Sequence, residues 1–73
     1  MDTLTEQQRA ILDVERQFWR TAGAKEEAIR ALELSPVRYH QVLVALIHTP
    51  AAMQSDPVLV KRLLRIASAR QRA

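Results

Sequence analysis

The chain has 73 residues, 11 Lys and Arg against 8 Asp and Glu, a formal net charge of +3 and no cysteine. This length predicts a single domain, residues 1–73, whose core is marginal because a chain so short buries only roughly 60% of its unfolded surface. The lack of cysteine excludes disulfides and thiolate zinc sites. No apolar run approaches the roughly 18 residues of a membrane span, and no signal peptide is recognised, so we expect a cytoplasmic protein without a membrane partner.

Positive charge is concentrated in the second half of the chain. Residues 1–33 contain five Lys and Arg against seven Asp and Glu, a balance of −2. Residues 34–73 contain six Lys and Arg against one acidic residue, a balance of +5. This asymmetry favours a polyanionic partner, because phosphate contacts dominate affinity for nucleic acids.

The first predicted helix runs from about Leu4 to Thr21. Its start is predicted from a capping box formed by Thr3 and Glu6. Gly23, the only glycine, is predicted to follow the helix as a left-handed C′ residue. A larger residue in that conformation would cost about 1 kcal/mol or more.

Four further segments have helical signals. The next helix is predicted from Ala24 or Lys25 to Glu33, followed by a turn and a longer helix over Ser35–Ile47. A short helix over 50–54 and a last helix over 57–69 complete the chain, with residues 68–73 expected to fray. Each of the three prolines follows Ser, Thr or Asp, so each is predicted to begin a helix rather than to break one.

Apolar residues at helical spacing predict the core. Trp19 is expected to pack there, the alternatives being a cation–π contact with Arg16 or base stacking. Val44 falls on the exposed side of its helix, which predicts that the last helix, a second subunit or another protein covers it. A homodimer is one way for so small a core to gain burial. The predicted core consists of Ile11, Val14, Phe18, Ile29, Leu32, Tyr39, Val42, Leu43, Leu46, Leu59, Leu63 and Ile66.

The predicted fold is all-α, a small helical bundle of four to five helices containing a helix-turn-helix. The segment from Lys25 to Val42, KEEAIRALELSPVRYHQV, resembles the helix-turn-helix of sigma-factor region 4. Glu33 stands where a turn glycine is common in that family. The positions that match its apolar pattern are Leu32, Leu34, Tyr39 and Val42.

A wider resemblance covers nearly the whole chain. It is similar to a small actinobacterial domain family of uncharacterised function, which implies an actinobacterial or phage source and a helix-turn-helix-like fold, and supplies no activity. The residues that carry this resemblance are Ile11–Arg16, Trp19, Ala22–Glu26, Ser35–Pro36, Arg38–Tyr39, Gln41–Leu43, Ala45–Ile47 and Asp56–Pro57.

The pattern predicts a small DNA-binding or transcription-associated protein. The N-terminal half of the Ser35–Ile47 helix is expected to enter the major groove of double-stranded DNA. There, Arg38 would contact guanine and Gln41 adenine. The predicted DNA-contacting residues are Ser35, Pro36, Val37, Arg38, His40 and Gln41, with Lys61, Arg62 and Arg65 as phosphate contacts from the last helix.

An alternative interpretation is that the chain is a protein-interaction module. It would bind RNA polymerase, a sigma factor or another regulator without reading DNA, and it predicts an exposed apolar patch around Val37 and Val44. No arrangement of His, Ser and carboxylates suggests catalysis, a cofactor or a metal site, so no enzyme is expected.

Overall fold

The computed structural model describes the backbone of residues 4–72 and the side chains of residues 4–70. In this part of the chain there are five helices and no strand, which confirms the all-α prediction. No helix in these residues is long and apolar enough to cross a membrane. The helices in chain order are α1 (Glu6–Arg16), α2 (Ala22–Ala31), α3 (Pro36–Ile47), α4 (Pro50–Ser55) and α5 (Pro57–Arg72).

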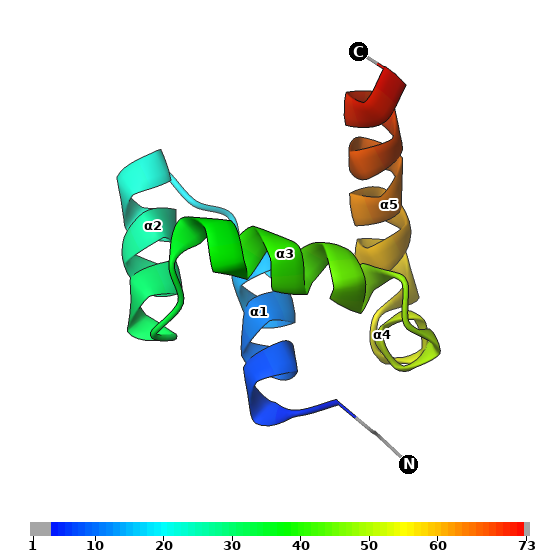
Figure 1. Ribbon diagram of the computed structural model, residues 1–73, viewed down its shortest axis with the longest axis horizontal. Helices are drawn as coiled ribbons and strands as arrows, with labels where there is room; N and C mark the ends of the chain where they lie inside the picture. Colours follow the sequence, from blue (N-terminus) through cyan, green and yellow to red (C-terminus); the bar gives the residue numbers. More distant parts are fainter. Residues whose placement is uncertain (1–3, 73) are drawn as a thin grey trace.

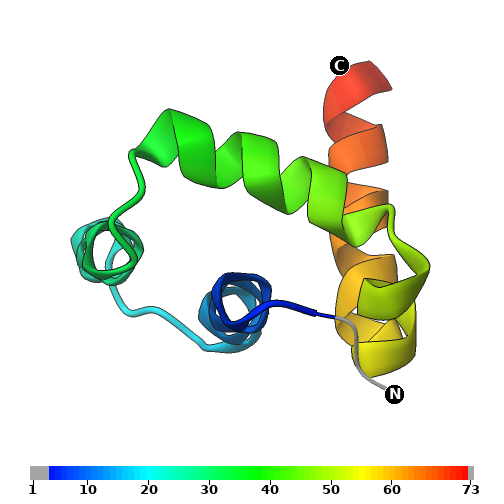
Figure 2. The same ribbon diagram turned by 60° about the horizontal axis from the view of Figure 1, so that its bottom comes forward.

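Helix α3 is the centre of the arrangement. It contacts α1, α2, α4 and α5, whereas the other helices share fewer neighbours. Figure 1 shows α3 crossing the molecule, with α2 standing across one end and α5 across the other. Figure 2 shows the same arrangement turned by 60°, with α1 on the inner side of α3 and no helix on the outer side of α3.

The three proline-started helices begin as predicted. The Ser35 hydroxyl accepts a hydrogen bond from the Arg38 amide at 3.1 Å, and the Thr49 hydroxyl accepts one from the Ala52 amide at 3.2 Å. Asp56 does the same for α5 through its carboxylate, 3.2 Å from the Leu59 amide. These caps satisfy amides that have no partner inside the helix, and the prolines that follow them have no amide to satisfy.

The first helix begins and ends at other residues than predicted. It begins at Glu6 rather than at the predicted Leu4, and Thr5 and Gln8 form a capping box in which each side chain accepts from the other's backbone amide. The predicted cap Thr3 lies outside the described residues. The helix ends at Arg16, five residues before the predicted Thr21.

Side chains explain this early end of α1. The Trp19 indole donates to the carbonyl of Val14 at 2.8 Å, and the Arg62 guanidinium donates to the carbonyl of Glu15 at 3.3 Å. Both carbonyls belong to the last turn of a helix, where no intrahelical donor reaches them. These two donors replace a glycine cap.

Two predictions about the segment after α1 are therefore wrong. Phe18 is 90% exposed, because it lies beyond the end of the helix whose apolar stripe it was assigned to. Gly23 does not end α1. It is the second residue of α2, has no positive φ, and a Cβ placed on it would meet nothing within 4 Å. Because Gly23 is not left-handed, a larger residue at this position is not expected to cost the protein stability through its backbone conformation.

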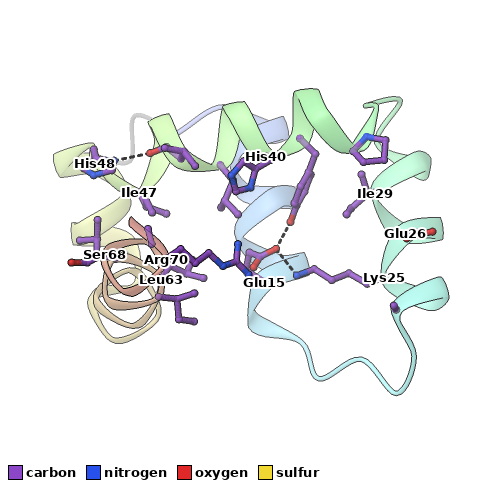
Figure 3. Close-up of a pocket in the computed structure, with 18 residues that line it drawn as sticks. Glu15, Lys25, Glu26, Ile29, His40, Ile47, His48, Leu63, Ser68 and Arg70 are labelled. Atoms are coloured by element: carbon purple, nitrogen blue, oxygen red, sulfur yellow. Dashed lines mark hydrogen bonds and ion pairs between the residues drawn. The ribbon is translucent and has the colours of Figure 1, made fainter. Parts of the chain in front are cut away.

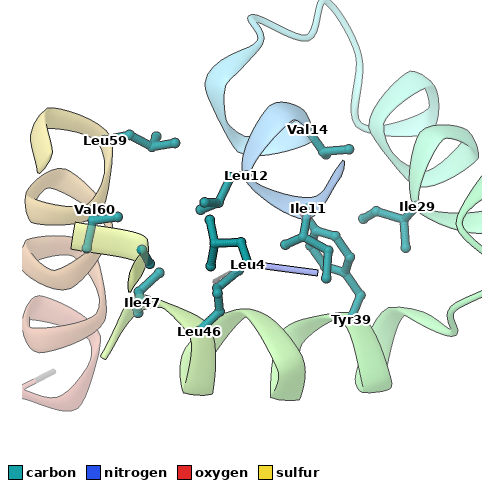
Figure 4. Close-up of a cluster of buried hydrophobic side chains, with 11 residues drawn as sticks. Leu4, Ile11, Leu12, Val14, Ile29, Tyr39, Leu46, Ile47, Leu59 and Val60 are labelled. Atoms are coloured by element: carbon teal, nitrogen blue, oxygen red, sulfur yellow. The ribbon is translucent and has the colours of Figure 1, made fainter. Parts of the chain in front are cut away.

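The core lies between α1 and α3 and continues to α5 (Figure 4). Leu4, from the segment before α1, is buried together with Leu12 and Leu46. Fully burying one such side chain contributes about 1.5–3 kcal/mol. The buried hydrophobic residues are Leu4, Ile11, Leu12, Val14, Ile29, Tyr39, Leu46, Ile47, Ala52, Leu59 and Val60.

Other predicted core residues differ in how far they are covered. Ile66 is 43% exposed because it lies on the half of α5 that extends beyond α3, so its assignment to the core is wrong. Helix α5 also continues to Arg72 rather than ending near Ala69. Trp19 packs against the core, as predicted. The predicted residues that are half-buried and pack against the core are Leu32, Val42, Leu43 and Leu63.

The turn between α2 and α3 contains the only positive φ among the described non-glycine residues. Helix α2 ends at Ala31 rather than at the predicted Glu33, and Glu33 adopts a φ of 61°. In this left-handed region, Cβ of an L-residue approaches the neighbouring carbonyl too closely. The chain thus turns through a strained, left-handed residue at Glu33.

Replacing Glu33 by glycine is expected to stabilise the protein. Glycine adopts this φ without the clash, which costs an L-residue about 1–2 kcal/mol. The midpoint of thermal unfolding, followed by circular dichroism, should rise by about 4 °C or more. Glu33→Ala is the matched control, because it removes the carboxylate and keeps Cβ. If the glycine variant melted no higher than the alanine variant, strain at this turn would be excluded.

Candidate nucleic-acid interface

The connection between α2 and α3 determines how α3 is presented. Leu32 to Ser35 join two helices that lie across one another in Figure 1, with the left-handed Glu33 in the middle of the turn. The Ser35 cap and Pro36 then fix the first turn of α3. This local geometry leaves the N-terminal end of α3 at the edge of the molecule.

One face of α3 is uncovered along the length of the helix. Val37 is 68% exposed, and Arg38, Gln41 and Ala45 are exposed beside it. No described residue makes a hydrogen bond or ion pair to the side chains of Arg38 and Gln41. The face combines a cation, an amide and a valine, which are the groups that recognise base edges and thymine methyls.

The other predicted contact residues of α3 lie near this face. Ser35, Pro36 and His40 are exposed. Ser35 is already engaged through its hydroxyl as the cap of the helix. Pro36 and His40 lie on the side of α3 that faces α5, where they line a groove described below. The structure thus brings all six predicted residues to one end of α3, on two adjoining sides.

The predicted cations of α5 do not join this cluster. Lys61 and Arg65 are exposed on the side of α5 opposite to its buried Leu59 and Val60. Helix α5 stands at the C-terminal end of α3, whereas Arg38 lies near its N-terminus (Figure 1). Arg62, also exposed, donates to the carbonyl of Glu15 and so connects α5 to the end of α1.

A buried carboxylate holds α1, α2 and α3 together. The Glu15 side chain is only 9% exposed. Its Oε2 accepts a hydrogen bond from the Tyr39 hydroxyl at 2.5 Å and lies 3.0 Å from Nζ of Lys25. Burial, and next the hydrogen bond to Glu15, raise the pKa of the Tyr39 hydroxyl well above its usual range. The pair of contacts fixes α2 and α3 against the last turn of α1.

A second polar link attaches α5 to α1. Asp56, the cap of α5, accepts a hydrogen bond from Nε of Arg16 at 2.9 Å. The Arg16 guanidinium, and next the Leu59 amide, lower the pKa of the Asp56 carboxyl. Together with Arg62, this link holds the N-terminal half of α5, while its C-terminal half extends away from the body.

Between the free half of α5 and α2 lies a groove of about 970 Å³ (Figure 3). Helix α5 forms one wall and α2 the other, and α3 extends from one wall to the other along one side of the groove. The lining is mostly apolar, with Glu26 and Arg70 among its charged residues. The apolar residues of α3 and α5 that line it are Leu43, Val44, Ile47, Leu63, Leu64, Ile66 and Ala67.

The sequence did not predict the Glu15 contacts or the groove. The burial of Glu15 could not be predicted from the sequence, since a lone acidic residue on an amphipathic helix is usually exposed to solvent. The groove depends on the angle between helices, which helical periodicity does not contain. One residue of the groove could be identified from the sequence. Val44 is apolar on the predicted exposed side of its helix, which predicted that another helix or a second molecule covers it. Val37 and Val44 do not form one patch: Val44 is half-buried in the groove, and Val37 is not part of its lining.

The comparisons with known proteins give one match. The model of a family described as a protein of unknown function (DUF3263) matches residues 3–73. No curated protein and no solved structure matches the chain. Within the described residues there is also no group of three or more His, Cys, Asp or Glu placed to hold a metal ion.

Tyr39→Phe is expected to remove a pH dependence of stability. Because the folded-state pKa of Tyr39 is raised, the unfolded chain loses its phenolic proton first, near pH 10, so stability should fall as the pH rises above about 10. The variant should lose this decrease, and should be less stable at pH 7 by about 1–3 kcal/mol because Glu15 loses a donor.

Urea unfolding of both proteins between pH 7 and 11 measures this difference. Since the chain has one tyrosine, absorbance near the tyrosinate band reports its ionisation directly. A native tyrosine that titrates near pH 10 would show that the hydroxyl is not buried against Glu15.

Proposed function

We propose that this chain, which belongs to the DUF3263 family of proteins of unknown function, binds double-stranded DNA through the N-terminal half of α3. In this proposal α2, the turn and α3 form a helix-turn-helix, and α3 is its recognition helix. The proposal assigns a transcription-associated role and no catalysis.

The observation that carries the proposal is the uncovered polar face of a helix that is otherwise the centre of the fold. A helix that contacts four others has little surface left, yet Val37, Arg38 and Gln41 are all exposed on one side of α3. Helix-turn-helix proteins present the start of the second helix to the major groove in this way. A four-residue turn and a left-handed residue within it are also typical of the motif.

The chemistry of the face suggests what each residue contacts. The guanidinium of Arg38 matches O6 and N7 of guanine, and the amide of Gln41 matches N6 and N7 of adenine. Val37 is suited to a thymine methyl. Ser35, Pro36 and His40 would lie beside the sugar-phosphate backbone, which sets the register of the helix in the groove.

Cations outside α3 would add affinity without sequence preference. Lys61 and Arg65 have no hydrogen bond or ion pair to any described residue, so both are free to contact phosphate. We assign Arg62 a smaller share, because its guanidinium already donates to Glu15. The excess of positive charge in residues 34–73 has the sign that this assignment requires.

Arg38→Ala is expected to weaken binding to a preferred sequence by about 1–3 kcal/mol and to relax the choice of base at one position. Sites selected from a random duplex library would supply the preferred sequence, and fluorescence anisotropy would measure the affinity. Arg30→Ala is the control, since it removes the same charge from an exposed residue of α2 that does not line the groove described above. Equal losses for both variants would remove the assigned base contact.

If the wild-type protein bound no duplex even at about 50 mM salt, the proposal would fail. A protein partner such as RNA polymerase or a sigma factor would then be the function to test, by co-purification from the host.

Lys61→Ala and Arg65→Ala are expected to weaken binding to all sequences. Each lost phosphate contact should flatten the slope of log affinity against log salt concentration by about one unit. Titrations of a random-sequence duplex between about 50 and 200 mM salt measure this slope. An unchanged slope in both variants would limit the DNA-binding surface to α3.

A further inference from the structure

The chain taken as a whole exposes more surface than a compact protein of its mass. Its accessible surface is 5469 Å², whereas a compact monomer of 8.3 kDa exposes about 4,600 Å². The radius of gyration, 12.2 Å, likewise exceeds the roughly 11 Å expected for this length. An open arrangement of this kind leaves surface for a partner, and a standard protein–protein interface buries roughly 800 Å² on each side.

Part of this surface is the apolar groove between α2 and α5. Ile66 contributes the most exposed side chain among its large hydrophobic residues, and Leu43, Val44 and Leu63 are only half-buried. Small soluble proteins seldom leave a contiguous apolar surface of this kind uncovered, and such a surface marks a site of interaction.

The matching feature is a single exposed aromatic side chain beside the groove. Phe18 is 90% exposed in the loop between α1 and α2. Glu15 and Ala22, which lie on either side of that loop in the chain, both line the groove, and Figure 3 shows the loop running from the end of α1 to the start of α2. An exposed aromatic side chain and an apolar recess are therefore separated by only a few residues of the chain.

We propose that two copies of this chain form a symmetric dimer in which Phe18 of each copy occupies the groove of the other. A two-fold axis requires that a surface be complementary to itself, and a projection beside a recess meets this requirement. Both contacts then form at once, and the assembly closes at two subunits. A buried aromatic residue at the centre of such an interface is a common source of binding energy.

Opposite charges near Phe18 and on the wall of the groove support a second copy of the chain as the partner that occupies the groove. Arg20 is exposed two residues after Phe18, and Glu26 is exposed on the α2 wall of the groove. Neither side chain has an ion pair within the described residues. When Phe18 enters the groove of the partner, Arg20 follows it towards a wall that presents a carboxylate.

This dimer is independent of the base contacts proposed for α3 and compatible with them. Val37, Arg38 and Gln41 do not line the groove, so they remain uncovered. Pro36 and His40 do line it, so the dimer would partly cover them and reduce the backbone contacts assigned to them above. If DNA binding is also found, the two copies of α3 would read two half-sites related by the same two-fold axis.

Sedimentation velocity without DNA, over about 1–200 μM protein, tests the dimer, since weak micromolar complexes fall in this range. The wild-type protein should be dimeric at the upper end. Phe18→Ala should raise the dimer dissociation constant at least tenfold without changing the helical circular dichroism, because the side chain is outside the core. Val58→Ala is the control, as Val58 is 79% exposed and does not line the groove.

Charge reversal gives a second test that does not depend on the aromatic side chain. Arg20→Glu and Glu26→Arg should each weaken the dimer, and the double variant should recover part of the loss. A monomer at every concentration would overturn the proposal, and so would a dimer that Phe18→Ala leaves unchanged. Because no DNA is present, these outcomes do not depend on the DNA-binding proposal.

Discussion

The structure depends on the way one buried carboxylate is paired. Glu15 lies at the end of α1 with its side chain almost fully covered, and an unpaired charge in such a place would be strongly destabilising. Lys25 and Tyr39 satisfy it from α2 and α3. These contacts place two helices against the same turn of α1, and so determine which side of α3 faces inward. The opposite side, with Arg38 and Gln41, is uncovered as a consequence.

The position of α5, at the other end of the molecule, depends on contacts with the end of α1. Arg62 donates to the last turn of α1, and Arg16 pairs with Asp56, so only the beginning of α5 is held. The rest of α5 continues to Arg72 without a neighbour on the side of α2. The groove is the space between this free half and α2. Thus the same turn of α1 organises both surfaces of interest, the uncovered face of α3 and the groove.

Local signals in the sequence predicted local structure well. Ser35, Thr49 and Asp56 were identified as caps because cap and proline preferences are properties of neighbouring residues. The predictions were wrong where contacts with residues distant in the sequence determine where a helix ends. The periodicity of α1 continued through Phe18, but Trp19 and Arg62 cap the helix earlier, and a donor from 47 residues away is not visible in a local pattern. Gly23 was assigned to the wrong helix for the same reason. For the site, the uncovered residues of α3 could be named from the sequence, whereas the groove and the role of Glu15 required the packing of four helices.

We propose that DNA meets the uncovered face of α3 with Val37, Arg38 and Gln41, and not the apolar walls of the groove. The most direct measurement is a titration of isotope-labelled protein with a random-sequence duplex, followed by two-dimensional amide NMR at low salt. The largest shifts are expected at the amides of Val37, Arg38 and Gln41, with little change at Leu63 and Ile66. Shifts concentrated in the groove with α3's outer face unchanged, or no shifts at all, would contradict it.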